Sequence, residues 1–340
     1  MNRELATKVA DAVLYEGYML YPYRPSAIKN RQRWSFGILY PPGYIEVLNR
    51  TERCAMHSEC LLRTNGEAHV QIQLRFLHLV RHEVTQTIDG RLQSVPKLIV
   101  DGSRIENWDE GMERSVDLEF MPITSKKQAE FYFPGSATTQ ALQDCGGRTV
   151  GRRADTQHEL RGTIAVSSEV ISESVYKLTI EITNTACLPP VITKRDDVLL
   201  RSLISTHSIL AVTGGEFVSL LDPSQELAHV VAHCSNTGNF PVLVGDRETG
   251  ERDMLLCSPI ILYDYPQIAP ESAGDFYDAT EMDEMLTLRV MTLTGDEKNE
   301  MRRADDRVRQ LLERTEQNVR EQLMRTHGTI RSMRPANEEP

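Results

Sequence analysis

LLCSPIILYDYPQIAPESAGDFYDATEMDEML, residues 255–286, is the stretch around which the rest of the sequence is interpreted. Its apolar run from Ile260 to Tyr263 predicts a short strand that is buried on both faces. Pro266 and a second proline four residues later withhold backbone donors and keep the chain extended. An acidic turn follows, and Thr280 is suited to cap a helix over the residues after it. A buried strand, a rigid elbow, an acidic loop and a helix within one short segment indicate a specified structure.

Upstream, from about residue 45 to residue 262, the hydrophobic pattern has a dominant period of two. Asn65-Gly66 and Asp89-Gly90 are turn signals of the kind that join hairpin strands. Many short strands that follow one another at roughly ten-residue spacing are typical of a β-sandwich or a pair of curved sheets. They do not alternate with helices, as the strands of a doubly wound sheet do. The segment 146–157 is polar and is predicted to be a surface loop. The predicted strands are 34–40, 53–63, 69–80, 82–88, 92–100, 116–120, 131–134, 160–170, 175–185, 204–212, 216–221 and 240–244.

Helices are predicted at both ends of the chain. Residues 4–15 place apolar side chains on one face. Near the other end, Thr294 and Glu297 have the spacing of a capping box, and an apolar stripe follows. That stripe consists of Met301, Ala304, Val308, Leu311 and Leu312, and it continues more weakly to Val319 and Leu323.

The predicted fold class is therefore α+β: a β-sandwich-like antiparallel body with an N-terminal helix and a C-terminal helical arm. The predicted divisions are an N-terminal helix and aromatic, basic junction over 1–40, the β-rich body over 41–265, the elbow and C-terminal helices over 266–327, and a disordered tail over 328–340.

The composition is that of a soluble globular protein, with 340 residues, 40% hydrophobic and 26% charged. A formal net charge of −11 disfavours a broad nucleic-acid-binding surface, which needs clustered positive charge. No apolar run is long enough to cross a membrane, and the first residues lack the apolar core of a signal peptide. We therefore expect a cytoplasmic protein that binds neither nucleic acid nor membrane. Its six cysteines are expected to be thiols rather than disulfides.

Two clusters have residue types that bind metals. His229 and His233 are four residues apart, next to Cys234, which on a helix would turn both imidazoles to one side. The segment could equally be a strand, on which residues four apart also share a face. A third ligand would have to come from elsewhere, and two histidines at a sheet surface or edge are the simpler interpretation. In Cys54-x-x-His57-x-x-Cys60 a strand would place the histidine opposite both thiols, which breaks the cluster. No metal or other cofactor is favoured by these patterns.

The 264–284 segment concentrates acidic side chains whose oxygens could hold Mg²⁺ or Ca²⁺. Their spacing does not match an EF-hand loop. Several of them are suited to a helix N-terminus, where the helix dipole favours anions, or to contact with a partner. A metal-dependent enzyme or metal-binding protein that uses His229/His233 or this acidic loop is therefore the alternative function.

No motif identifies a catalytic centre. Ser205-Thr-His207 and Ser258 occur without the Gly-x-Ser-x-Gly elbow of a serine hydrolase. Glu83 and Glu119 lie on predicted strands, where a glycosidase could place its paired carboxylates, but any β-rich protein has such residues. No catalytic residue is assigned, and the sequence favours a non-enzymatic protein.

Between Tyr15 and Trp34 the sequence gathers tyrosines and basic residues. Stacking of nucleic-acid bases on these rings is one interpretation. A protein-contact surface or a packed helix-to-sheet junction is favoured over it, because tyrosine and arginine are enriched in interface anchors. A thin apolar stripe at the end of the last helix suits a partner or a second copy of the chain. The predicted partner-binding residues are Tyr18, Tyr21, Tyr23, Arg24, Asp264, Glu271, Val319 and Leu323.

Two long stretches, VADAVLYEGYMLYPYRPSAIKN at 9–30 and SPIILYDYPQIAPES at 258–272 with LTLRVMTLT at 286–294, resemble a known family. The middle of the chain agrees in Ser205-Thr-His207 and in PVLVG at 241–245. The chain is similar to uncharacterised accessory proteins encoded beside nickel–iron hydrogenases of actinobacteria and related soil bacteria. The resemblance implies a role in assembly or maturation of such a hydrogenase, with a hydrogenase subunit or a maturation factor as partner. It supplies no catalytic residues.

Overall fold

The structure is a computed structural model of the chain, and it describes residues 3–16, 33–48, 52–267, 290–304 and 307–316. The chain forms two compact units. The first unit comprises residues 1–18 and 34–267, and the second comprises residues 19–33 and 268–340. The β-rich part of the sequence therefore belongs to the first unit together with the N-terminal helix.

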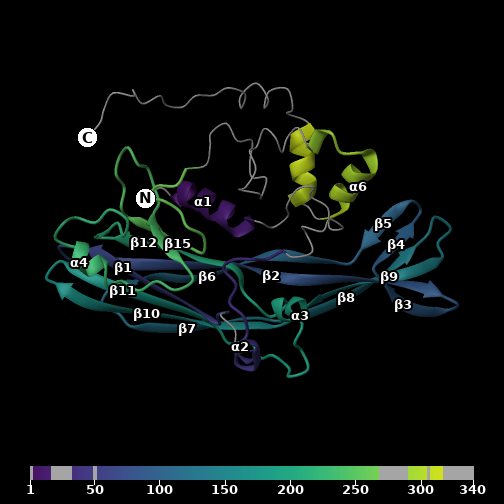
Figure 1. Cartoon of the computed structure of the whole chain (residues 1–340), viewed down its shortest axis with the longest axis horizontal. Helices are drawn as coiled ribbons and strands as arrows, with labels where there is room; N and C mark the ends of the chain where they lie inside the picture. The colour runs from purple at the N-terminus through teal and green to yellow at the C-terminus, as the bar shows by residue number, and fades with distance from the viewer. Residues whose placement is uncertain (1–2, 17–32, 49–51, 268–289, 305–306, 317–340) are drawn as a thin grey trace. The chain divides into compact units, whose positions relative to one another are not determined.

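Two antiparallel sheets pack against each other in the first unit (Figure 1), which confirms the predicted α+β fold with a sandwich-like body. The five-stranded sheet has the order β13 (Glu216–Phe217), β1 (Ala55–Arg63), β11 (Val175–Asn184), β10 (Leu160–Ser172), β7 (Lys127–Phe133). The eight-stranded sheet has the order β14 (Phe240–Leu243), β15 (Met254–Ser258), β12 (Ile204–Thr213), β2 (His69–Ile88), β9 (Thr149–Gln157), β8 (Ser136–Gln143), and β2 also pairs with β3 (Arg91–Val95) and β6 (Trp108–Pro122). A separate hairpin joins β4 (Lys97–Val100) to β5 (Ser103–Glu106).

Strand β2 is the long central element of the eight-stranded sheet. Its first part lies between β12 and β6, and its last part lies between β9 and β3. Because side chains alternate along a strand, its even-numbered residues from 70 to 76 all point between the sheets and are fully buried. Beyond the sandwich, Val84 packs with Leu98 and Val100 of the β4–β5 hairpin in a second, smaller core. Figure 1 shows β3, β4 and β5 together at one end of the sheets.

Helix α1 (Arg3–Tyr15) covers the outer face of the eight-stranded sheet, as the helical pattern predicts. Its buried residues Ala6, Val9, Ala10 and Val13 pack against β12, β14 and β15. Three shorter helices lie in the connections: α2 (Pro42–Leu48) between α1 and β1, α3 (Arg195–Leu199) between β11 and β12, and α4 (Ala228–Val231) between β13 and β14. None of the described helices is long and apolar enough to cross a membrane.

The Asn65-Gly66 turn does not join a hairpin. The strands before and after it, β1 and β2, belong to different sheets, so the turn carries the chain from one sheet to the other. Thr64 fixes the crossing, because its hydroxyl donates to the carbonyl of Gly214 at 2.6 Å and accepts from the N–H of Gly66 at 3.2 Å. Asp89-Gly90 does join a hairpin, β2–β3, with positive φ at both residues.

The predictions for two segments, 34–40 and 146–157, are wrong. Residues 34–40 form only one bridge, between Leu39 and Leu203, rather than a strand. The segment 146–157 is not a loop, because most of it is strand β9, paired with β8 on one side and β2 on the other. Strand β9 carries few apolar residues, so its sequence does not show the alternation of apolar and polar residues that predicts a strand. Its backbone nevertheless pairs with both β8 and β2.

The predicted strand from Ile260 to Tyr263 is also wrong. Strand β15 ends at Ser258, Pro259 has no N–H to donate, and the Ser258 hydroxyl accepts from the N–H of Ile260 at 3.2 Å. The chain therefore leaves the sheet at this point. Ile261 is 75% exposed and Tyr263 is 83% exposed, whereas the residues beside them pack on the cluster beneath α1.

In the second unit, the structure describes α6 (Gly295–Ala304) and a further helix over 307–316. The predicted capping box is confirmed, because the N–H of Thr294 donates to the Glu297 carboxylate at 2.8 Å and the Thr294 hydroxyl accepts from the N–H of Glu297 at 3.3 Å. The stripe residues Met301, Val308, Leu311 and Leu312 are buried. Most of the helix predicted after Thr280, the tail, and both Val319 and Leu323 lie outside the described residues, and residues 290–291 are helical.

Candidate functional site

The best-defined candidate for a binding surface is the short segment that follows β15. It exposes Ile261 and Tyr263, and Leu221 nearby in the fold is 55% exposed. We call these three residues the anchored apolar surface. At this exposure the three side chains contribute little to the core, and large apolar side chains gathered on one surface are a candidate contact site.

Asp264 holds this segment in place. One carboxylate oxygen accepts from the N–H of Leu243 at 2.8 Å, and the other accepts from the Ser219 hydroxyl at 2.5 Å. The N–H of Tyr265 donates to the carbonyl of Leu243 at 2.7 Å, so the segment also covers part of the edge strand β14. The Ser219 hydroxyl in turn accepts from the N–H groups of Leu221 and Asp222, which fixes the turn that carries Leu221.

These contacts give Asp264 a structural role, and its predicted contact with a partner stays a prediction. Both of its carboxylate oxygens are used within the chain, so it positions the exposed residues beside it. The remaining partner-binding predictions, Tyr18, Tyr21, Tyr23, Arg24, Glu271, Val319 and Leu323, fall outside the described residues and stay predictions.

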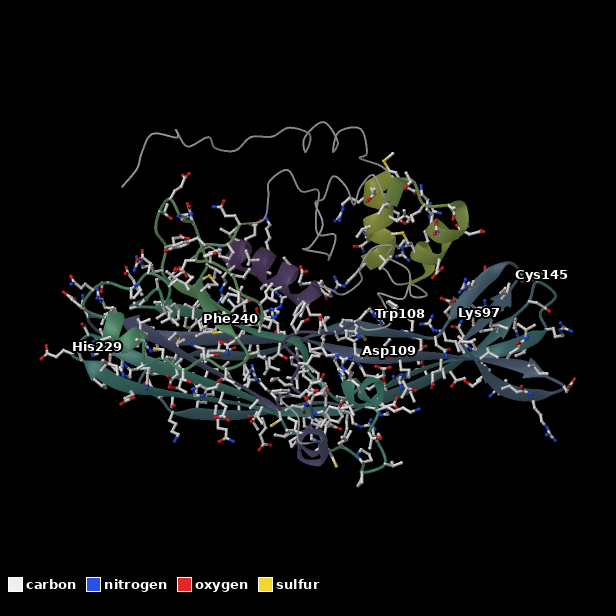
Figure 2. The ribbon with its side chains drawn as sticks, in the orientation of Figure 1. Lys97, Trp108, Asp109, Cys145, His229 and Phe240 are labelled. Carbon is white, nitrogen blue, oxygen red and sulfur yellow. The ribbon has the colours of Figure 1, made fainter. Side chains whose placement is uncertain are left out.

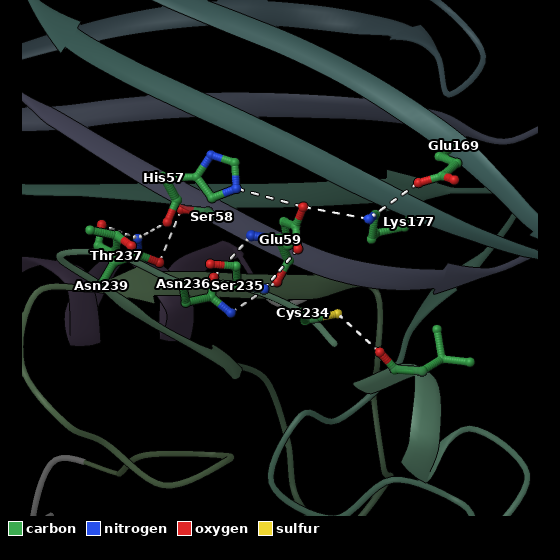
Figure 3. A network of polar contacts seen from close by, with 11 residues as sticks. His57, Ser58, Glu59, Glu169, Lys177, Cys234, Ser235, Asn236, Thr237 and Asn239 are labelled. Atoms are coloured by element: carbon green, nitrogen blue, oxygen red, sulfur yellow. Dashed lines mark hydrogen bonds and ion pairs between the residues drawn. The ribbon is translucent and has the colours of Figure 1, made fainter. Parts of the chain in front are cut away.

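A polar network attaches the loop 234–239 to strand β1 (Figure 3). The backbone groups of His57 and Thr237 pair in both directions, at 3.1 and 2.8 Å. The side chain of Asn236 accepts from the N–H of Glu59 at 2.9 Å and donates to its carbonyl at 3.2 Å. Asn239 accepts from the Ser58 hydroxyl at 3.0 Å and donates to the His57 carbonyl at 2.8 Å.

The network closes an otherwise open sheet edge. On this side β1 pairs with β13 only at its last two residues, so the loop supplies the partners for the residues near its start. Glu59 extends the network to Lys177, and Lys177 reaches Glu169 at 3.2 Å. The sequence analysis missed this loop, although the Asn236-Thr-Gly-Asn239 composition is a turn signal that could have identified it.

The His229/His233 pair lies at helix α4 and its end. The two ring centroids are 6.4 Å apart, but His233 Nδ1 is engaged by the His229 carbonyl at 2.7 Å and both side chains are exposed. Cys234 turns its thiol to the carbonyl of Val230. Figure 2 shows His229 and Cys145 at opposite ends of the sheets. Within the residues that the structure describes, no three His, Cys, Asp or Glu side chains are grouped to hold a metal ion.

In the 54–60 motif, β1 separates His57 from Cys60 as expected, whereas Cys54 comes before the strand begins. Cys60 is fully buried between the sheets, where burial raises the pKa of its thiol. His57 points the other way, towards Glu59 at 3.6 Å. All six cysteines are free thiols, as predicted.

The Ser205-Thr-His207 segment is buried in β12 and is not arranged for catalysis. Ser205 has a φ of 52° at a bulge, and its carbonyl engages His207 Nδ1 at 2.8 Å. Burial is the main cause that lowers the pKa of His207 to about 3, and the Arg75 charge lowers it further. Ser258, the other candidate, is buried, and its hydroxyl accepts a hydrogen bond from the N–H of Ile260.

Glu83 and Glu119 do not form a pair. Both are exposed, but Glu119 lies on β6 opposite the start of β2, whereas Glu83 lies near the end of β2. About a dozen strand residues separate the two positions, which corresponds to roughly 40 Å.

A cluster that the sequence analysis missed surrounds His82 where β2 passes from the sandwich into the β4–β5 end. His82 Nδ1 is 2.6 Å from Asp155 of β9, and Nε2 is 3.0 Å from Glu110 of β6. These carboxylates belong to strands on opposite sides of β2. Arg153 donates its Nε–H to Asp155 at 2.8 Å, but its guanidinium also lies 2.8 Å from His82 Nδ1 and opposes protonation there.

The net effect on His82 is a raised pKa. Burial lowers it, and the hydrogen bonds that His82 donates to Glu110 and Asp155 outweigh that effect. The His82 hydrogen bond is the main cause that lowers the pKa of Glu110; for Asp155, burial opposes the lowering and the bonds from His82 and Arg153 produce it. A protonated His82 therefore links three strands through two charged hydrogen bonds.

We expect this link to weaken as the pH rises. A group whose pKa is raised on folding stabilises the fold fully below its unfolded value of about 6.5, and this contribution is lost as the pH rises through the folded value. Urea unfolding at about pH 6 and about pH 8.5 should show a larger loss of stability in the wild type than in His82→Gln. His78 and His207, whose pKa values are lowered, act in the opposite sense in both proteins and cancel. Equal losses of stability in the wild type and His82→Gln would contradict the stabilising role of protonated His82.

The comparisons with known proteins give no family. No protein-family model matches the chain, and no curated protein matches it.

Proposed function

We propose that this chain is a cytoplasmic, non-enzymatic accessory protein that aids assembly or maturation of a nickel–iron hydrogenase through protein–protein contacts. Its partner is a hydrogenase subunit or another maturation factor. Two things support the proposal. The sequence resembles accessory proteins encoded beside such hydrogenases, and the structure presents the anchored apolar surface. The exposure of Ile261 and Tyr263 on a fixed segment is the observation that carries the proposal.

The anchored apolar surface has the properties of an interface anchor. Tyrosine is one of the residues most often found at the energetic centre of protein interfaces. Because Asp264 fixes the backbone through Leu243 and Ser219, little conformational entropy remains to be lost when a partner binds. Exposed side chains on a mobile loop would lack this advantage.

The alternative is a metal-dependent enzyme or metal-binding protein. The geometry of His229 and His233 does not favour it within the described residues, and most of the 264–284 segment lies outside them. Metal analysis of the purified protein separates the two functions, since stoichiometric zinc, nickel or iron that is lost in His229→Ala/His233→Ala would favour the alternative.

The contact is tested with Ile261→Asp and Tyr263→Asp. Both side chains are exposed, so neither variant should change the melting temperature by more than about 2 °C. Each should weaken binding to the purified hydrogenase subunits or maturation factors by about tenfold or more, because a carboxylate at an apolar contact must lose its hydration. Val191→Asp, at a position that is 86% exposed and elsewhere in the fold, is the matched control and should bind normally.

The result that would contradict the proposal is normal partner recovery by both variants in a titration that detects the wild-type complex. Failure of the wild type to bind any hydrogenase subunit or maturation factor would also reject the proposed partner.

A further inference from the structure

A cavity of about 360 Å³ opens beside the loop that Figure 3 shows attached to β1. Residues 36–39, the start of β1, the 236–240 loop and Pro259 line it. Half of its twelve lining residues are apolar, namely Phe36, Ile38, Leu39, Met56, Phe240 and Pro259. Leu39 and Met56 are buried in the main core, whereas Phe240, labelled in Figure 2, is 43% exposed. The cavity therefore runs from an apolar floor towards solvent.

Arg53 is the one charged residue among those that line the cavity. Its guanidinium makes no hydrogen bond or ion pair with any residue that the structure describes. It lies over Gly238, where an added Cβ would be 3.1 Å from Nη1 and 3.7 Å from Cδ. Gly238 has a φ of +83°, so glycine here permits both the turn and the position of the arginine.

The other polar groups of the wall are already used. The amides of Asn236 and Asn239 are bonded to β1, which fixes the 236–240 loop. No lining residue carries a negative charge. The cavity thus combines a fixed apolar space with one positive charge and no counter-ion among the described residues.

We propose that this cavity binds a small monocarboxylic acid with an apolar body. The volume lies at the lower end of the range of about 300–1,000 Å³ typical of small-molecule sites. Arginine binds a carboxylate through two parallel hydrogen bonds. Burial of the apolar body of the ligand against the apolar wall removes it from water, which favours binding. A cationic ligand would meet Arg53 without a partner for its own charge. A polyanion would meet only one positive group in a chain of net charge −11.

The test uses phenylacetate as the probe and phenylacetamide as its neutral match. Ligand-observed NMR and calorimetry measure the binding of each to the full chain. We expect phenylacetate to bind about tenfold or more tightly than the amide, a difference of about 1.4 kcal/mol or more. Arg53→Met keeps the apolar stem and should remove this preference. Arg63→Met, at the far end of β1, should keep it.

A second variant tests the space itself. Ile38→Trp fills the cavity and should abolish binding of both probes, with its melting curve showing whether the fold is kept. Equal affinity for acid and amide, or an acid preference that survives in Arg53→Met, would overturn the proposal. So would absence of binding to the wild type at millimolar phenylacetate, or unchanged binding in a folded Ile38→Trp.

Discussion

Removal of the two carboxylates beside Arg75 is expected to destabilise the fold far more than removal of Arg75 itself. Arg75 is 4% exposed under α1, and its guanidinium contacts Asp11 of α1 and Glu113 of β6, both at 2.5 Å. Asp11→Ala/Glu113→Ala leaves a buried cation with no counter-ion among the described residues, which costs about 3–5 kcal/mol. Burial opposes the positive charge, and the bonds to Asp11 and Glu113 nevertheless raise the pKa of Arg75.

Arg75→Met should cost much less, about 1 kcal/mol, although it breaks the same contacts. The carboxylates of Asp11 and Glu113 are 49% and 38% exposed, so water can solvate them once the arginine is gone. Urea unfolding monitored by circular dichroism measures the free energy of unfolding of the wild type, of Arg75→Met and of the double variant. Asp117→Ala is the control and should stay near wild type, because this acid on the same strand β6 bonds the exposed polar groups of Gln73 and Ser115. Equal losses in Arg75→Met and the double variant would show that the asymmetry of burial does not govern this cluster.

Phe76→Ala is expected to cost about 3–5 kcal/mol, because it opens a cavity between the sheets. Phe76 is fully buried on β2, and its ring centroid lies 5.8 Å from both Phe131 and Phe133 of β7 in the opposite sheet. These rings join the two sheets directly. The surroundings have little freedom to close the gap, since Gly162 already packs against Phe131 so closely that an added Cβ would be 2.2 Å from its ring.

Tyr132 provides the matched control on the same strand. It lies between the two phenylalanines in sequence, but its side chain is 52% exposed and stacks with Arg161 on the surface. Tyr132→Ala should therefore lose no more than about 1 kcal/mol. Thermal and urea unfolding of the two variants decide the matter, and a similar loss in both would mean that the rings between the sheets are not the main contact.

The sequence was most informative where one physical pattern dominates. The alternation of apolar residues along 69–80 predicted a strand, and β2 starts with alternating burial at 69–73 before both of its faces become buried at 74–79. The Thr294/Glu297 spacing predicted a helix start, because a capping box uses only atoms within four residues. In both cases the deciding interactions are local or repeat at a fixed period.

The candidate surface shows where this reasoning failed. A run of four apolar residues at 260–263 resembles a buried strand, yet Pro259 and Ser258 end the ladder just before it. Asp264 was predicted from the sequence as a partner-binding residue, whereas its bonds to Leu243 and Ser219 involve residues about twenty and forty-five positions away. Its role as an anchor could not be read from its neighbours in the chain.

The sequence by itself determined the α+β class, the antiparallel sheets, the N-terminal helix and the capped C-terminal helix, since alternation, helical period and capping are local properties. The tertiary structure alone decided that Asn65-Gly66 joins two sheets, that polar strand β9 completes a ladder, and that Ile261 and Tyr263 face outward. It alone brought His82 to Glu110 and Asp155, and Arg53 to its cavity. The physical reason is that pairing partners and burial depend on contacts between distant segments, which a local pattern does not specify.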